Sequence, residues 1–297
     1  MQTQALAKSP RKWLQFTKER FDPASHLVMI LLFVIAHRLL FPGHTTPLAV
    51  LAVFLGTVAF FFKLRLYDEI KDYELDLVIN PTRPLARGLM THSDLYKGIA
   101  FCIVLELALF GLQGPAALAA IAIAITYSLL MYKEFFIRDL IRPHLTTYAV
   151  SHTVVSALLS LALISAFIHR YPWQLSREAQ LFALNSWCLF NIFEFGRKTF
   201  TSSEERDGVE SYSKIFGRSG AVGLVVSMAL ASAYCLIRVR YSATLQTFII
   251  VACAALIGVG AIYAFMNRPP YGKVYRAFSS IYIVIIYLGI VGIRQLS

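Results

Sequence analysis

The stretch LRLYDEIKDYELDLVINPTRPLARG occupies residues 64–88 and follows, after one lysine, an apolar run that ends in VAFFF. Five of the 17 acidic residues of the chain lie within nine of its positions: Asp68, Glu69, Asp72, Glu74 and Asp76. Carboxylates four residues apart on a helix repel each other by roughly 0.2–0.5 kcal/mol per pair. We therefore expect a cationic partner for this cluster, at the mouth of a segment long enough to cross a membrane.

The composition places the chain among membrane proteins. Hydrophobic residues make up 57% of its 297 residues and charged residues 15%, against about 25% charged residues in a soluble domain. A spanning helix needs about 20 mostly apolar residues. We expect an all-α polytopic membrane protein whose nine transmembrane helices form one bundle around a central cavity. The expected spans are 25–42, 46–63, 95–112, 115–132, 144–168, 179–196, 217–237, 244–266 and 275–294.

Charge predicts the orientation. Residues 1–24 are basic and polar and lack the apolar core of a signal peptide, so they are expected to form a cytoplasmic segment ahead of a single domain at 25–297. Alternate loops put 22 of the 28 Lys and Arg on the side of the N-terminus, and such an excess marks the cytoplasmic side. The C-terminus is therefore expected outside, across the inner membrane if the source is bacterial. The net charge of +11 thus reflects topology; we expect membrane lipid as a partner and no nucleic acid, and the sequence indicates no protein partner.

The aspartates of the first cluster have the spacing of a ligand stripe. Asp68, Asp72 and Asp76 share one face if the helix of the second span continues to that point, and Glu69 lies about a quarter turn away. Mg²⁺ usually takes one or two carboxylates together with water and substrate phosphate oxygens. The alternative is a solvated helix end whose charges form salt bridges.

A second acidic cluster favours the metal and diphosphate interpretation. It follows the sixth expected span, on the same side of the membrane as the first, and bases accompany both clusters. Guanidinium forks bind phosphate well. The acids of the second cluster are Glu204, Glu205, Asp207 and Glu210, and the bases that could bind phosphate are Lys71, Arg83 and Arg87 in the first and Arg197 and Lys198 in the second.

The stretch DEIKDYELDLVINPTRPLARG (68–88) resembles the first aspartate-rich motif of the UbiA superfamily of intramembrane prenyltransferases, Asn-x-x-x-Asp-x-x-x-Asp followed by Lys/Thr-x-Arg-Pro-Leu-x-x-Gly. Asp72 and Asp76 match its two aspartates, and Asp68 stands where the asparagine usually is. Arg83-Pro84-Leu85 and Gly88 match the tail. TYSLLMYK (126–133) is similar to a tyrosine-and-lysine segment of the family, and DGVESYSKIFGRSGAV (207–222) to its Gly-x-x-Ser-x-Ser-x-x-x-Gly stretch.

The second motif of the family, Asp-x-x-x-Asp, is only half present. Its two acids would fall on Phe200 and Glu204, while FEFGRKTF (193–200) puts Glu194, Arg197 and Lys198 where family members hold acids. The resemblance therefore implies that bases bind part of the phosphate in this chain.

The activity that the resemblance implies is the Mg²⁺-dependent transfer of a prenyl group from a prenyl diphosphate to a lipophilic acceptor, an aromatic one being the first candidate. It implies Asp68, Asp72, Asp76 and Glu204 as catalytic residues, the same four with Glu69 as metal ligands, and Lys133 as a further diphosphate-binding base. A terpene cyclase, or a glycosyl or phosphoribosyl transferase acting on polyprenyl phosphate, would use the same fold. An anionic-lipid transporter is less favoured, because no clear internal repeat is present.

Polar residues inside the expected spans need partners. Glu106 lies in the middle of the third span, where a lone charge costs at least ~2.5 kcal/mol on insertion scales. We expect it to face the bundle interior, paired or protonated, either joining helices or serving as an acid at the acceptor site. For His152 and Asn191, structural hydrogen bonds are the favoured interpretation.

Overall fold

The structure is a computed structural model that describes residues 11–43, 45–239 and 242–296. Of residues 295 and 296 it describes only the backbone. The start of the expected N-terminal segment and the C-terminal residue lie outside this part of the chain. Every regular element in the described part is a helix. The prediction of an all-α protein is therefore confirmed for the described residues.

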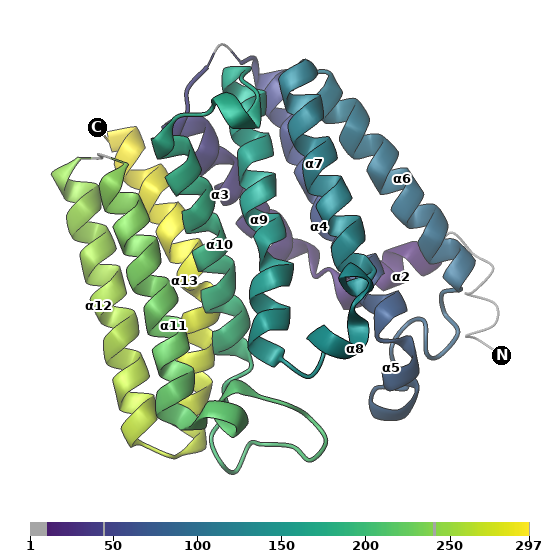
Figure 1. The fold of residues 1–297 in the computed structure, drawn as a ribbon, viewed down its shortest axis with the longest axis vertical. Coiled ribbons are helices and arrows are strands. Elements are labelled where there is room, and N and C mark those ends of the chain that lie inside the picture. Colours follow the sequence, from purple (N-terminus) through teal and green to yellow (C-terminus); the bar gives the residue numbers. More distant parts are fainter. Residues whose placement is uncertain (1–10, 44, 240–241, 297) are drawn as a thin grey trace.

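Nine helices of the described part have 18 residues or more, and each overlaps one expected span (Figure 1). Seven of them are long and apolar enough to cross a membrane, whereas α6 and α10 do not meet this criterion of length and hydropathy. The chain is thus an integral membrane protein, while the count of nine spans stays a prediction. The nine helices are α3 (Pro23–Leu40), α4 (Pro47–Lys71), α6 (His92–Gly111), α7 (Pro115–Tyr132), α9 (Leu145–Ile168), α10 (Arg177–Arg197), α11 (Tyr212–Arg238), α12 (Ala243–Phe265) and α13 (Pro269–Leu296).

Short helices mark the two ends of the bundle. α5, α8 and the loop 199–211 all lie toward the lower end of the bundle in Figure 1, which we call the site end. α2 lies close to this end, beside α4 and α6. The short helices are α2 (Arg11–Arg20), α5 (Tyr73–Ile79), η1 (Glu134–Phe136), α8 (Arg138–Ile141) and η2 (Pro172–Gln174).

Prolines and capping side chains in the sequence mark where several of the long helices begin. Prolines stand in the first turn of α3, α4 and α7, where the missing N–H costs nothing. Side-chain oxygens of Thr46, Ser176 and Ser242 accept hydrogen bonds from the first turns of α4, α10 and α12. Such caps satisfy N–H groups that have no partner within the helix.

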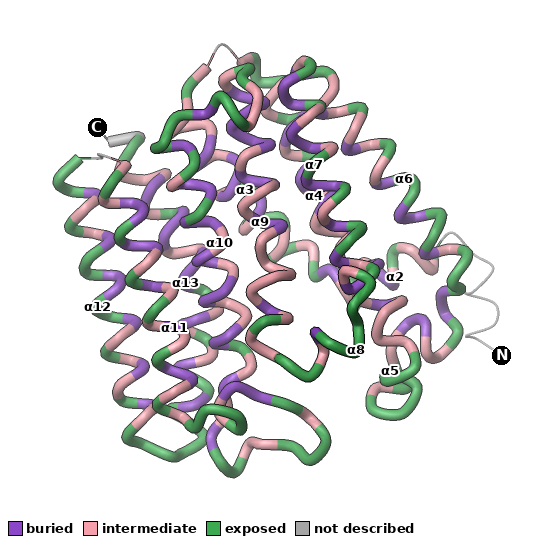
Figure 2. Tube along the Cα trace, viewed as in Figure 1, coloured by how far each residue is buried: buried purple, intermediate pink, exposed green. Residues whose placement is uncertain are grey.

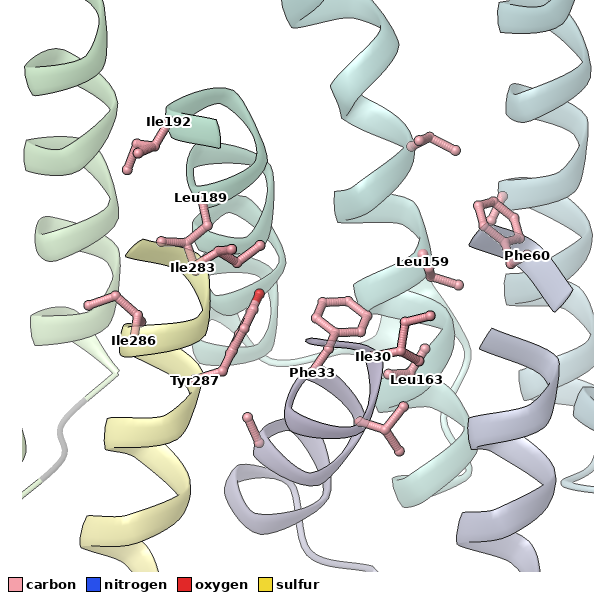
Figure 3. Packing of buried hydrophobic residues seen from close by; sticks show 14 of the residues in the cluster. Ile30, Phe33, Phe60, Leu159, Leu163, Leu189, Ile192, Ile283, Ile286 and Tyr287 are labelled. Carbon is pink, nitrogen blue, oxygen red and sulfur yellow. The ribbon is translucent and has the colours of Figure 1, made fainter. Parts of the chain in front are cut away.

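The long helices form a closed ring. α3 packs against α4, α4 against α6 and α7, α7 against α9, α9 against α10, and α10 to α13 follow one another until α13 returns to α3. Buried positions recur along the helices between the two outer edges, whereas α6 and α12 at the edges carry many exposed positions (Figure 2). In Figure 3, buried Phe33 of α3 points between Tyr287 of α13 and Leu163 of α9. Side chains fill the ring at this level, and the central cavity stays a prediction.

The charge inside the third span is paired. Glu106 of α6 accepts a hydrogen bond from the ammonium group of Lys63 on α4 at 2.5 Å, and neither side chain is exposed. The expectation that Glu106 faces the interior is confirmed. Lys63 lies within the bundle and joins α4 to α6.

Candidate active site

The first acidic cluster lies where α4 leaves the bundle. α4 ends at Lys71, and Asp72 is both the C-cap residue of α4 and the N-cap residue of α5. The backbone N–H of Asp72 donates to the carbonyl of Asp68 (3.0 Å), and that of Asp76 donates to Asp72 (2.7 Å). The four-residue spacing thus persists, although the helix breaks at Asp72, so the condition that one helix continues to residue 76 is not met.

The three aspartates have different surroundings. Asp68 is partly exposed and forms an ion pair with Arg65 at 3.2 Å. Burial, and then the charge of Asp68, raises the pKa of Asp72. Asp76 is 3% exposed; its Oδ1 accepts from Asn80, whereas its buried Oδ2 accepts no hydrogen bond and lies 3.4 Å from Arg83. These carboxylates hold negative charge that the described residues only partly balance.

Glu69 and Arg87 have structural partners. The buried Glu69 accepts hydrogen bonds from Arg20 of α2 (2.7 Å) and from the backbone N–H of Leu85 (3.0 Å), one at each oxygen. Arg87 donates two hydrogen bonds of 2.8 Å to Glu19 of α2. The geometry assigns these two residues to the attachment of α2 and the loop after α5, and it gives no support to the expected roles in metal and diphosphate binding.

Lys71 turns toward α9. Its ammonium group donates to the Tyr148 hydroxyl at 2.8 Å, and the phenol ring stacks on His152 with centroids 3.8 Å apart. The Tyr148 hydroxyl in turn donates to Glu134 at 3.3 Å. The expected base Lys133 is exposed, and its ammonium group lies over the ring of Tyr132.

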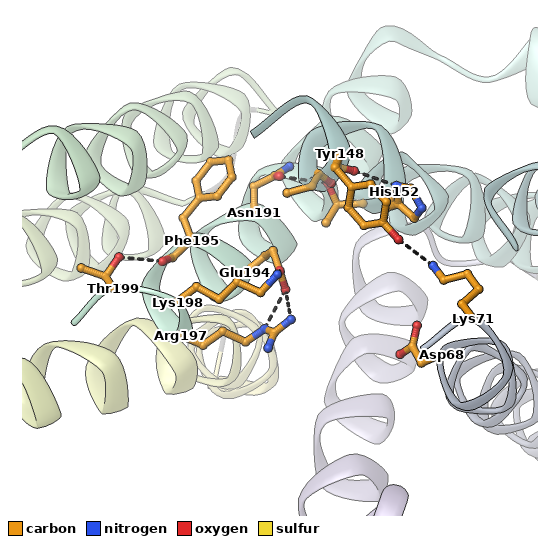
Figure 4. Close-up of polar contacts among 12 residues, drawn as sticks. Asp68, Lys71, Tyr148, His152, Asn191, Glu194, Phe195, Arg197, Lys198 and Thr199 are labelled. Atoms are coloured by element: carbon orange, nitrogen blue, oxygen red, sulfur yellow. Dashed lines mark hydrogen bonds and ion pairs between the residues drawn. The ribbon is translucent and has the colours of Figure 1, made fainter. Parts of the chain in front are cut away.

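The end of α10 provides a group of three charges. Arg197 donates to one oxygen of Glu194 (2.6 Å between Nη2 and Oε2), and Lys198 to the other (2.8 Å). In Figure 4 these three residues lie on one side of the view and Asp68 and Lys71 on the other. Hydrogen bonds also connect α4 to α9, between Lys71 and Tyr148, and α9 to α10, between Thr153 and Asn191. Arg197 and Lys198 are thus placed on the side of α10 that looks toward α4.

Glu204 is turned away from this place. Both of its oxygens accept hydrogen bonds from Arg276 of α13 (2.9 and 2.5 Å), and Thr201 donates to it at 2.7 Å. The hydrogen bonds from Arg276 lower the pKa of Glu204 to about 2. The structure thus gives no support to Glu204 as a metal ligand, and the acid beside Arg197 and Lys198 is Glu194. Its spacing of three and four residues from two bases was the signal in the sequence.

The remaining acids can hold a metal ion only in part. In the described chain, no group of three or more His, Cys, Asp or Glu is arranged to bind a metal ion. Mg²⁺ needs only one or two protein carboxylates, because phosphate oxygens and water complete its octahedron. The buried Oδ2 of Asp76, which accepts no hydrogen bond and has Arg83 only at 3.4 Å, and the raised pKa of Asp72 fit such a cation.

Two solved structures are similar to this chain. One concerns a digeranylgeranylglyceryl phosphate synthase in membranes, with a TM-score of 0.69 and 17% sequence identity over 97% of this chain and 100% of the other. The second is the apo structure of a UbiA homologue from Aeropyrum pernix K1, with a TM-score of 0.61 and 17% identity over 90% and 98%. No family model matches the sequence, and no curated protein matches it significantly. The fold of this chain is therefore UbiA-like, which confirms at the level of the fold the resemblance read from the sequence.

Proposed function

We propose that this protein is an intramembrane prenyltransferase, which uses Mg²⁺ and moves a prenyl group from a prenyl diphosphate to a lipophilic acceptor. The observation that carries the proposal is the placement of carboxylates at the end of α4 opposite bases at the end of α10, within a UbiA-like membrane bundle. A metal-diphosphate complex carries charges of both signs. Such a ligand suits a site that has acids on one side and bases on the other.

Asp72 and Asp76 are the proposed metal ligands, with Asp68 beside them. When bound, Mg²⁺ would neutralise negative charge on the leaving diphosphate. The two ligands come from the break between α4 and α5, so the backbone hydrogen bond that joins them (2.7 Å) fixes their spacing. Asn80 holds Asp76 through one oxygen and leaves the other for the cation.

Arg197, Lys198 and Arg83 are the proposed diphosphate ligands. The first two now share Glu194, and a diphosphate carries more negative charge than one carboxylate, so it can compete for the same donors. Arg83 approaches Asp76 only at 3.4 Å, a weak contact that a phosphate oxygen can replace. Together these bases would stabilise charge as the bond between the prenyl carbon and the diphosphate oxygen breaks.

The acceptor would bond to the prenyl carbon and lose a proton. Tyr148, His152 and Asn191 line the α9 and α10 side of the same region (Figure 4). His152 donates through Nδ1 to the Tyr148 carbonyl (2.7 Å), since a carbonyl can only accept. Its Nε2 therefore carries a lone pair, and that atom has no partner in the described structure. These polar groups could orient an acceptor.

The test is turnover by the purified full chain. Labelled prenyl diphosphates, Mg²⁺ and lipophilic acceptors should give a prenylated acceptor and free diphosphate. A cyclised hydrocarbon would instead indicate a terpene cyclase, and the absence of turnover with every acceptor would refute the proposal.

The contribution of Arg197 can be separated from a role in anchoring α10. Because lysine replaces a bidentate guanidinium poorly, Arg197→Lys should raise the KM for the prenyl diphosphate. Arg268→Lys, an exposed arginine between α12 and α13, is the matched control and should leave it unchanged. Normal kinetics for well-expressed Arg197→Ala would remove Arg197 from the site.

A further inference from the structure

A cavity of about 620 Å³ lies between α2, α4 and α6. None of the candidate active-site residues lines it. Its walls are almost entirely apolar, with Leu55 and Phe62 from α4, Phe101 and Leu109 from α6, and Trp13 from α2. Its volume lies within the range of about 300–1,000 Å³ that small-molecule sites occupy.

The cavity opens toward the lipid rather than toward the centre of the ring. Phe101 is 66% exposed and Leu55 44% exposed, although both helices carry buried residues on their other faces. On a helix that spans a membrane, such exposed apolar side chains face hydrocarbon. The occupant must therefore be apolar along most of its length and must come from the bilayer.

One end of the cavity is cationic and lies at the membrane surface. Lys97, near the start of α6, is the charged residue of the lining; it is exposed and has no ion-pair partner among the described residues. Trp13 stands beside it, and tryptophan is enriched at the level of the lipid head groups. The indole can lie against α6 because residue 98 is glycine, where a Cβ atom would come within 2.6 Å of the ring.

Helix α2 adds further positive charge to the same end. Its sequence, RKWLQFTKER, contains four bases and one acid. Three ion pairs hold it in place: Lys12 with Asp94 (2.7 Å), Arg20 with Glu69 (2.7 Å) and Glu19 with Arg87 (2.8 Å). Lys18 of the same helix is exposed. This charge attracts an anionic head group and not a zwitterionic one.

The length of the cavity matches one leaflet. The lining residues of α6 extend from Lys97 to Leu109, which is about 18 Å along the helix axis at 1.5 Å per residue. One leaflet's share of a hydrocarbon core is about 15 Å. A single chain that starts at the head-group level would reach the far end of the cavity.

We propose that this cavity binds one anionic phospholipid of the leaflet at the site end, with an acyl chain between α4 and α6 and its phosphate at Lys97. The site does not depend on the proposed transferase activity. Because α2 covers the cavity and also holds Glu69 and Arg87, the bound lipid would help to keep the loop after α5 in place.

The test uses Trp13 as the reporter. In a Trp173→Phe/Trp187→Phe background the remaining tryptophan lines the cavity, and phosphatidylglycerol with brominated acyl chains should quench it more strongly than brominated phosphatidylcholine. Lys97→Gln should weaken the preference for phosphatidylglycerol by about fivefold, the effect of one lysine near a membrane surface. Lys273→Gln, an exposed lysine at the start of α13, should leave the preference unchanged.

Ala59→Phe provides a second variant, because Ala59 lines the cavity and a phenyl ring there would fill it. In this variant, both brominated lipids should quench the fluorescence of Trp13 less. Phosphatidylglycerol that co-purifies with the otherwise unchanged chain, counted by mass spectrometry for Lys97→Gln and Lys273→Gln, gives the same comparison without tryptophan replacement. The proposal would be overturned by equal quenching by the two lipids or by equal effects of the two lysine variants. It would also be overturned if Ala59→Phe changed the oligomeric state in place of losing lipid, which would indicate a second copy of the chain as the occupant.

Discussion

Replacement of Lys63 by methionine should strongly destabilise the bundle. The Lys63 and Glu106 side chains have no exposure, and one contact of 2.5 Å joins them. The second oxygen of Glu106 has no hydrogen-bond partner, so removal of the ammonium group leaves a buried carboxylate without compensation. Breaking a buried pair from one side costs about 3–5 kcal/mol. We expect the lower end of this range, about 3 kcal/mol, because the carboxylate can take up a proton instead of remaining charged.

The assay is equilibrium unfolding in detergent of Lys63→Met, Glu106→Leu and the double variant. The double variant should regain most of the loss, because apolar replacement of both members of a buried pair is often neutral or stabilising. Lys214→Met, an exposed lysine at the start of α11, controls for the loss of a positive charge and should remain within about 0.5 kcal/mol of the unchanged chain. If Lys63→Met also stays within this limit, or if the double variant is no better than the worse single one, the pair does not join α4 to α6 as the structure indicates.

Three further predictions concern the carboxylates of the site end. Asp72→Asn should stabilise the substrate-free protein and remove its stabilisation by Mg²⁺. The raised pKa of Asp72 means that its ionised form costs stability, increasingly so as pH rises above the ordinary range of aspartate. Melting curves across pH, with and without Mg²⁺, would check this. Glu204→Gln should lower the free energy of unfolding by about 1–3 kcal/mol, because it leaves donors of Arg276 without their charged acceptor. With a pKa of about 2 for Glu204, this stabilisation is present above the ordinary pKa of glutamate and is lost only as pH falls toward about 2. The difference in melting temperature should therefore stay constant between about pH 5 and 8. Glu69→Ala should lower stability by about 2 kcal/mol without substrate or metal, since the buried N–H of Leu85 loses its acceptor, and unchanged melting would return Glu69 to the metal-ligand set.

The spans were predictable because hydropathy needs no knowledge of tertiary contacts. A run of about 20 apolar residues has few alternatives to a spanning helix, and prolines such as Pro47 and Pro115 fix where two of the helices begin. The end of the second span shows the limit of this reasoning. Hydropathy ends it at residue 63, but α4 continues to Lys71, because hydropathy reports the thickness of hydrocarbon and a helix can continue beyond it.

The roles of single charges were harder to predict, because each depends on a partner far away in the sequence. Lys63 meets Glu106 43 residues later, and Glu204 meets Arg276 72 residues later. A motif count can place Glu204 in the chain, but it cannot show which way the loop turns the side chain. Arg276 decides this, and no local spacing announces it.

Among the described residues, the ion pairs at the site end form within each side and not across the gap. On the α10 side Glu194 occupies both Arg197 and Lys198. On the α4 side, Asp72 is crowded by Asp68, and one oxygen of Asp76 accepts no hydrogen bond, so this side can take a further cation. If the bases existed only to neutralise the aspartates, the ion pairs would join α4 to α10, and Glu194 would be superfluous. The observed pairing instead suits a ligand that brings its own positive and negative parts, since a cation alone would satisfy only the aspartates and an anion alone only the bases. The replacement of acids by bases at the end of α10 is thereby compatible with a metal-diphosphate ligand, provided that the metal is held mainly from α4 and the diphosphate mainly from α10.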